Sequence, residues 1–233
     1  MRNYVIINGT NSLTIQGLAI KTLPPISKPL MRTMREEIDG RNGDITTELG
    51  YSAYDKTIEV GLFGTYNIND VIKFFNSSGT ITFSNEADKY YNFQISDPID
   101  FEEMIKFRTA TINLHCQPFK YPLTNTPVSL TSGDNTITNA GNIYSKPILV
   151  ISGSGTISVS LNGSQIFSID MTDVSSITID TELMEAYDTN LGVLLNRKVT
   201  GDYSKFKLEV GSNTINLSGT IGTSNISYIT RWL

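Results

Sequence analysis

The sequence predicts a mainly β protein of two domains, and three observations support this. Only 18% of the 233 residues are charged, while Ser, Thr, Asn and Gly are abundant, a composition typical of strands and turns. Apolar and polar side chains alternate with period two in both halves. Residues 1–122 carry 26 charged side chains, whereas residues 123–233 carry 15. We therefore expect domains at 1–122 and 123–233.

The boundary between the two domains has its own sequence marker. Pro118, Pro122 and Pro127 fall within ten positions. Proline restricts the backbone on both sides of itself and removes a hydrogen-bond donor. A short, semi-rigid linker is therefore expected here.

The first domain is expected to be mostly strand with one short helix. Asn69 can cap this helix, Val71, Ile72, Phe74 and Phe75 give it an apolar face, and Gly79 would end it. Pro24-Pro25 excludes a central strand around residues 23–26. Strands are expected at 4–7, 13–15, 56–60, 80–83, 90–95 and 107–116.

The second domain reads as strands throughout. Two alternating runs flank Asn162-Gly163, which is a strong hairpin signal. One helical turn is expected at 182–187. The strands, at spacings that suit a β-sandwich, are expected at 148–151, 156–161, 165–169, 176–179, 205–210, 214–217 and 226–232.

No group of residues predicts catalysis, a metal or a cofactor. His115 and Cys116 are the single His and the single Cys, so neither a disulfide nor a His/Cys zinc site can form within the chain. As neighbours on a strand they point to opposite faces and cannot form a dyad. The paired carboxylates lie in charged turns and read as solvated loops: Glu36-Glu37, Glu102-Glu103 and Asp170 with Asp173. We expect a protein that is not an enzyme.

Charge and hydropathy also limit the possible partners. The net charge of −5 argues against a dedicated nucleic-acid binder, which needs a basic surface. The apolar run at the N-terminus is too short for a signal peptide. The uncharged stretch 147–169 alternates as a strand does, so no membrane partner is expected. The chain is expected to be made in a cytoplasm.

Several segments, in order, resemble one known family. They are YVIING (4–9), GRNG (40–43) with Tyr51, ITFSNEADKYY (81–91), CQPFKY (116–121), and residues 139–142 with 145–147, 179–180, 211–215 and 231–233. In this order and spacing the sequence resembles the distal tail protein (Dit) of siphophages that infect Gram-positive bacteria. The resemblance runs over essentially the whole chain.

The resemblance implies a fold and a role. It implies an N-terminal domain that forms a hexameric ring and a C-terminal galectin-like β-sandwich. The homo-hexamer would be a hub at the virion tail tip, made in the host bacterium. It would join the tail tube protein to a tail-associated lysin or baseplate hub protein and to receptor-binding proteins. DNA would pass through the central channel without stable binding.

The ring joint is expected in the first domain. A ring is one heterologous interface repeated until it closes, and open sheet edges are ready joints for it. The proline-containing arm 23–34 and the loop 40–43 fit no internal core by pattern. The expected interface residues are Leu23, Pro24, Pro25, Ile26, Met31, Arg32, Met34, Arg41 and Asn42.

Two other functions stay open. A carbohydrate-binding module for cell-wall glycans would expose aromatic side chains on one sheet. A non-catalytic subunit of a wall hydrolase would form a one-to-one complex and no ring of its own. Galectins bind sugar with a His, Asn, Arg and Trp cluster, but the second domain has no His, and its arginines are Arg197 and Arg231 only.

Overall fold

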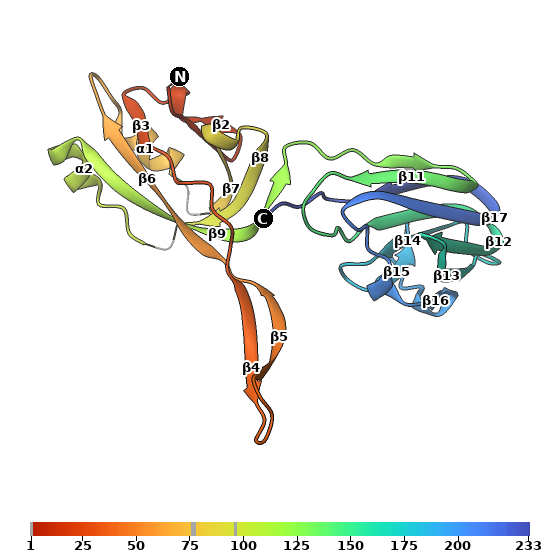
Figure 1. Ribbon diagram of the computed structural model, residues 1–233. Coiled ribbons are helices and arrows are strands. Elements are labelled where there is room, and N and C mark those ends of the chain that lie inside the picture. Colours follow the sequence, from red (N-terminus) through yellow and green to blue (C-terminus); the bar gives the residue numbers. More distant parts are fainter. Residues whose placement is uncertain (1, 76–77, 96) are drawn as a thin grey trace. The chain divides into compact units, whose positions relative to one another are not determined.

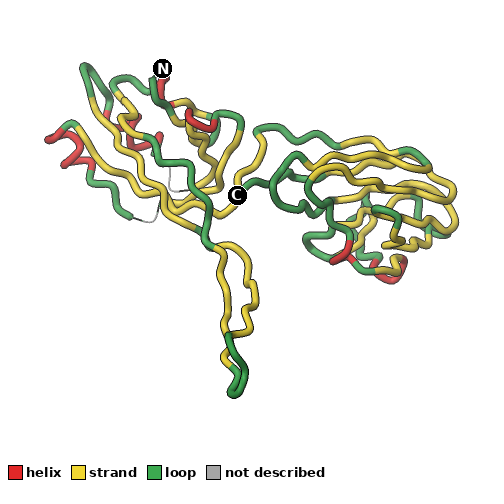
Figure 2. The backbone as a smooth tube through the Cα atoms, viewed as in Figure 1, coloured by secondary structure: helices red, strands yellow, loops and turns green. Residues whose placement is uncertain are grey.

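The computed structural model describes residues 2–75, 78–95 and 97–233 and is mainly β. The chain forms two compact units. The first runs up to Leu123 and also includes the last residue, Leu233, and the second spans Thr124–Trp232. Figures 1 and 2 show strands dominating both units. Each unit has its own cluster of buried hydrophobic side chains.

The first unit is built on an antiparallel sheet of seven strands. Their order is β2-β1-β7-β8-β9-β6-β3. Asn8 and Gly9, with φ of 48° and 82°, turn the chain between the first two strands. The strands are β1 (Val5–Ile7), β2 (Thr10–Asn11), β3 (Leu18–Thr22), β6 (Tyr54–Leu62), β7 (Ser78–Phe83), β8 (Lys89–Gln94) and β9 (Thr109–Pro122).

One face of this sheet holds the core and the other is polar. On β9, Ile112 and Leu114 are buried, while Asn113 and His115 are exposed. Within the strand expected at 107–116, the alternation is therefore confirmed from Thr111 to Cys116. On β6, Ile58 is likewise buried. Because β9 runs on to Pro122, the first part of the expected linker is a strand.

Two helices accompany the sheet, where one was expected. In α1 (Ile68–Phe74) the cap is Asn67, whose side chain accepts from the Asn69 amide, so the expected start was two residues late. Ile72 is exposed rather than buried. Gly79 lies in β7 and does not end the helix.

The helix not expected from the sequence is α2 (Phe101–Phe107). Asp100 caps it by accepting a hydrogen bond from the Glu103 amide at 2.8 Å. The expected strand at 107–116 therefore begins later, at Thr109. The expected strand at 13–15 is also wrong, because Ser12–Thr14 (η1) is a single 3₁₀ turn whose Asn11 side chain accepts from the Leu13 amide.

Two strands of the first unit do not join its main sheet. β4 (Met31–Glu37) and β5 (Asp44–Tyr51) pair with each other as a separate two-stranded sheet. Figure 1 shows this ribbon extending away from the main sheet at one end of β6. Gly40 and Gly43, both with φ of 81°, form the turn at its tip, as GRNG predicts.

The second unit is a sheet of eight strands. Its main path is β10-β17-β12-β13-β16, with β11 on β17, β14 on β12 and β15 on β14. The strands are β10 (Val128–Leu130), β11 (Gly133–Asn139), β12 (Ile148–Leu161), β13 (Ser164–Asp170), β14 (Ser176–Asp180), β15 (Glu185–Asp188), β16 (Val199–Gly201) and β17 (Gly211–Ser227).

The two long strands make this sheet fold over its own core. The first half of β12 pairs with β14 and with the end of β17, and its second half pairs with β13 and with the start of β17. The register breaks between these halves, beside Gly153, where a Cβ would lie 2.3 Å from the Thr220 carbonyl oxygen. Such breaks let a strand pass from one layer to another. Buried side chains from both halves, including Ile151 and Val159, form one cluster.

Local signals predicted part of this unit. Asn162 and Gly163, with φ of 51° and 83°, make the expected hairpin turn between β12 and β13. The helical turn expected at 182–187 is wrong, because its second half is β15. The strand expected at 205–210 is also wrong: Tyr203–Lys205 (η4) is a 3₁₀ turn, and Leu208 makes an isolated bridge.

Candidate assembly surface

The β4–β5 hairpin has two chemically different faces. Met34 lies opposite Thr47 and Glu36 opposite Ile45 in the register. Because side chains alternate along a strand, Leu49 shares this side with Ile45. The side chains of Met34, Ile45 and Leu49 are 53%, 37% and 51% exposed. We call these three residues the apolar face of the hairpin.

The opposite face of the hairpin is polar and mainly acidic. Glu37 pairs with Asp44, Arg35 with Thr46, and Thr33 with Glu48. The Arg35 Nε lies 3.7 Å from the Asp44 Oδ2. Across residues 31–51 the chain carries five carboxylates and three arginines. The hairpin is therefore amphipathic, yet every residue between its two ends is exposed.

At its base the hairpin is closed by hydrogen bonds between its own two ends, and it contacts the rest of the first unit through Tyr51. The Ser52 amide donates to the Leu30 carbonyl at 2.8 Å, and the Arg32 guanidinium donates to the Leu49 carbonyl at 3.0 Å. Tyr51 packs edge-on against Phe119 of β9, with 5.9 Å between centroids. Among the described residues, β4 and β5 pair with no other strand. An isolated two-stranded hairpin is marginally stable in water, so this one needs a further contact.

Three side chains hold the arm that leads into β4. The Asn85 amide donates to the Pro24 carbonyl at 3.0 Å, and the Lys56 ammonium donates to the Pro25 carbonyl at 3.1 Å. The Tyr54 hydroxyl donates to the Ser27 carbonyl at 3.5 Å. Prolines cannot donate backbone hydrogen bonds, so the arm is bound through its carbonyl groups.

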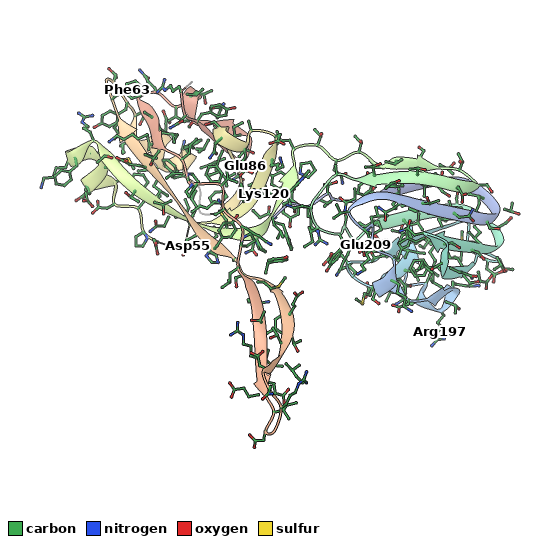
Figure 3. The ribbon with its side chains drawn as sticks, viewed as in Figure 1. Asp55, Phe63, Glu86, Lys120, Arg197 and Glu209 are labelled. Atoms are coloured by element: carbon green, nitrogen blue, oxygen red, sulfur yellow. The ribbon has the colours of Figure 1, made fainter. Side chains whose placement is uncertain are left out.

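A buried polar cluster lies beneath the arm. Lys120 Nζ is 2.7 Å from Glu86 Oε1, and the Tyr91 hydroxyl donates to Glu86 Oε2 at 2.5 Å. Lys56 Nζ stands 5.0 Å from the centroid of the Tyr91 ring. Burial lowers the pKa of Lys56 and raises the pKa of Tyr54 to about 12. Figure 3 labels Glu86 and Lys120 within the first unit.

The expected interface residues divide into three groups. Leu23 packs against the core of the first unit and Pro24 is buried, so the expectation that the arm fits no internal core fails for these two. Met31 is half-buried at the hairpin base. The remaining residues are exposed: Pro25, Ile26, Arg32, Met34, Arg41 and Asn42.

Sequence reasoning missed the second strand of the hairpin. Ile45 and Leu49 on this strand are exposed apolar residues of the same face as Met34. A signal was present, because Asn42-Gly43 is a favoured hairpin turn and Ile45, Thr47 and Leu49 alternate after it.

The single His and the single Cys are not placed for catalysis. His115 Nδ1 lies 2.7 Å from Asp55 Oδ1 on the polar face of the main sheet. Cys116 is buried on the opposite face, as expected for strand neighbours. Burial raises the pKa of the Cys116 thiol to about 12. The reactive thiolate is therefore not formed near neutral pH.

The carboxylate pairs have structural partners. Glu102 and Glu103 occupy the first turn of α2, where acidic side chains stabilise a helix. Hydrogen bonds from the Thr172 hydroxyl and from Lys198 lower the pKa of Asp170.

Over residues 2–75, 78–95 and 97–233, no group of three or more His, Cys, Asp or Glu side chains could hold a metal ion. In the same residues no helix has both the length and the apolar character needed to span a bilayer.

Comparison with solved structures relates both units to one protein. The SPP1 Dit protein, described as a paradigm of the hub adsorption apparatus in Gram-positive-infecting phages, matches with a TM-score of 0.68 over 100% of both chains, at 14% identity. The chain has a Dit-like fold. No family model and no curated protein sequence matches it.

Two weaker matches also come from phage tails. They are chains of the phage P2 baseplate in its activated conformation, with Ca and with Sr, at TM-scores of 0.47 and 0.46 and 12% identity. They cover 98% of this chain and 98% and 97% of their own lengths. The SPP1 match covers the full length of this chain, and so both of its units.

Proposed function

We propose that this protein is a structural hub of a phage tail tip. In this proposal six copies form a ring that joins the tail tube to a tail-associated lysin or baseplate hub protein and to receptor-binding proteins. The observation that carries it is the match to SPP1 Dit over the whole of both chains, because it includes both units in one order. At 14% identity, this match supports the fold, and the assembly of six copies is our own inference.

The exposed hairpin supports assembly through the first unit. Its apolar face would be left in water in a monomer, and burying apolar area contributes about 25 cal/mol per Å². Its strand edges also lack partners among the described residues, and such edges readily pair with another chain.

The charge of the first domain supports a channel that DNA crosses without being held. Residues 1–122 carry 12 basic and 14 acidic side chains. Retaining a duplex requires many cations on its phosphates. We infer that measurable duplex binding at physiological salt would contradict this role.

The carbohydrate-binding alternative receives no support from the second unit. Its exposed aromatic among the described residues is Tyr144, whose ring has Lys207 Nζ at 5.0 Å and Arg231 Cζ at 5.3 Å from its centroid. A sugar-binding platform needs an open aromatic face. We also propose that the protein has no catalytic activity, since His115 and Cys116 lie on opposite faces of one strand.

Native mass spectrometry and electron microscopy test the proposal. We expect an annular particle of about six times the 25.7 kDa of one chain. A protein that stays monomeric at micromolar concentration would contradict the ring. A one-to-one complex with a wall hydrolase, without self-assembly, would support the hydrolase-subunit alternative instead.

A further inference from the structure

The arm reaches the hairpin through residues 23–30, which form no helix and no strand. Figure 2 shows this segment as a loop that ends at the hairpin. Its three prolines, Pro24, Pro25 and Pro29, have no amide hydrogen to donate. A regular ladder of backbone hydrogen bonds therefore cannot place the arm, and side chains from other elements must decide where it lies.

The buried polar cluster beneath the arm contains two ammonium groups and one carboxylate. Lys56 and Lys120 are 3% and 4% exposed. The Glu86 carboxylate binds Lys120, at 2.7 Å, and accepts a hydrogen bond from the Tyr91 hydroxyl. Taking an ammonium group out of water is costly unless other groups replace the water. The charge of Lys56 therefore needs partners other than Glu86.

The arm supplies the hydrogen-bond acceptors of Lys56. Its Nζ donates to the Pro25 carbonyl at 3.1 Å, and Ser27 Oγ lies 3.5 Å away. Nζ also lies 4.9 Å from the centroid of the Tyr54 ring and 5.0 Å from that of Tyr91. Ring faces attract a cation, but they accept hydrogen bonds only weakly. An arm that covered the cluster in any other position would bury this ammonium group without a strong acceptor.

We propose that Lys56 is a positioning residue, whose ammonium group restricts the arm, and with it the hairpin, to one position on the first unit. The other end of the hairpin joins β6 through Ser52 and Ala53. One connection permits rotation about it, whereas two connections fix a direction. The inference concerns a single copy of the chain, so it goes beyond the proposed ring and does not depend on it.

The effect of Lys56 is on position more than on stability. An apolar side chain of similar length at a buried charged site often leaves the free energy of unfolding unchanged or raises it. Such a side chain would not penalise wrong positions of the arm, because it has no charge to leave unpaired. Lys56→Met should therefore fold, yet allow the arm and the hairpin several positions.

Single-molecule fluorescence energy transfer tests this directly. One dye is attached at Arg41→Cys, in the turn of the hairpin, and the other at Thr111→Cys, on β9. Both side chains are exposed, whereas Cys116 is buried and should take up no dye. With Lys56 present we expect one narrow distribution of transfer efficiency. Lys56→Met should make it about twofold wider, or split it. Picomolar concentration keeps the measurement on single copies, whether or not a ring forms.

Two control variants separate the charge of Lys56 from its bulk. Lys56→Arg keeps a buried cation and should keep the narrow distribution. Lys21→Met removes an exposed lysine of β3, which pairs with Glu59, and should also stay narrow. Urea unfolding establishes that each variant is folded, and Lys56→Gln replaces Lys56→Met if the latter is not. A neutral variant as narrow as the wild type, a Lys56→Arg protein as broad as the neutral variant, or a wild type that is itself broad would overturn the proposal.

Discussion

Glu86 is the residue on which the buried cluster under the arm depends. It accepts hydrogen bonds from both Lys120 and Tyr91, and the Lys120 and Glu86 side chains are only 5% and 12% exposed. Glu86→Gln would leave the buried Lys120 without its counter-charge. We expect the free energy of unfolding, measured with urea, to fall by about 3 kcal/mol.

An exposed ion pair in the same unit provides the control. Lys21 Nζ lies 3.3 Å from Glu59 Oε1, with side chains 43% and 40% exposed. Water screens such a pair, so Glu59→Gln should cost less than about 1 kcal/mol. Equal losses in the two variants would contradict the role assigned to the buried pair.

Cys116 should make stability depend on pH in the alkaline range. Burial raises the pKa of its thiol from 9.0 to about 12, so the folded state holds this proton more tightly than the unfolded state. The resulting stabilisation is complete below pH 9.0 and is lost as the pH rises towards 12. Between about pH 8 and about pH 10.5, the wild type should lose more unfolding free energy than Cys116→Ala. Parallel pH profiles of the two proteins would exclude this effect.

Among the elements, β1 and β7 are joined through a contact that requires glycine. Gly79 has a φ of 139°, and a Cβ there would lie 1.9 Å from Asn8 Oδ1. That oxygen accepts a hydrogen bond from the Thr80 backbone amide at 2.9 Å, and the side-chain amide nitrogen of Asn8 donates to the Ser78 carbonyl at 3.1 Å. Gly79→Ala should therefore lower the free energy of unfolding by about 2–3 kcal/mol, as measured by calorimetry.

Gly9→Ala separates the backbone effect from the clash. Gly9 also has a positive φ, 82°, but a Cβ there would meet nothing within 4 Å. Its substitution should cost about 1 kcal/mol, the backbone penalty alone. If Gly9→Ala were as destabilising as Gly79→Ala, the Asn8 contact would not explain the effect.

Elements that depend on local chemistry were predictable, and those that depend on distant pairing were not. Asn162-Gly163 marks its hairpin because both residues adopt positive φ readily. The Asp100 cap was just as local and could have revealed α2. By contrast, residues 211–227 form one strand only because β12 pairs along most of its length. No local signal in the sequence specifies such a partner.

In the candidate assembly surface, too, only the features set by local sequence signals could be predicted. The GRNG turn predicted a loop with two positive-φ glycines, and Met34 was among the expected interface residues. Whether a residue such as Pro24 is buried depends on Asn85, which lies 61 positions away and donates to its carbonyl. The sequence therefore predicted where the chain turns, but not that both faces of the hairpin lie open.

For the whole molecule, the proposed ring assigns assembly to the first unit, which carries the exposed β4–β5 hairpin. The first unit has a complete core of its own, with Val5, Ile58 and Leu114 all fully buried. Its β4–β5 hairpin is exposed along almost its whole length. The second unit buries a separate core. Ring formation should therefore be a property of the first unit alone.

Truncation tests this division. A chain of residues 1–123 should fold and assemble to the same number of copies as the full-length protein, while residues 124–232 should fold and stay monomeric. Light scattering coupled to size-exclusion chromatography measures both masses, and far-ultraviolet circular dichroism confirms the strands. If residues 1–123 folded but remained monomeric while the full chain assembled, the second unit would contribute to the joint. The interface would then have to include surfaces outside the hairpin.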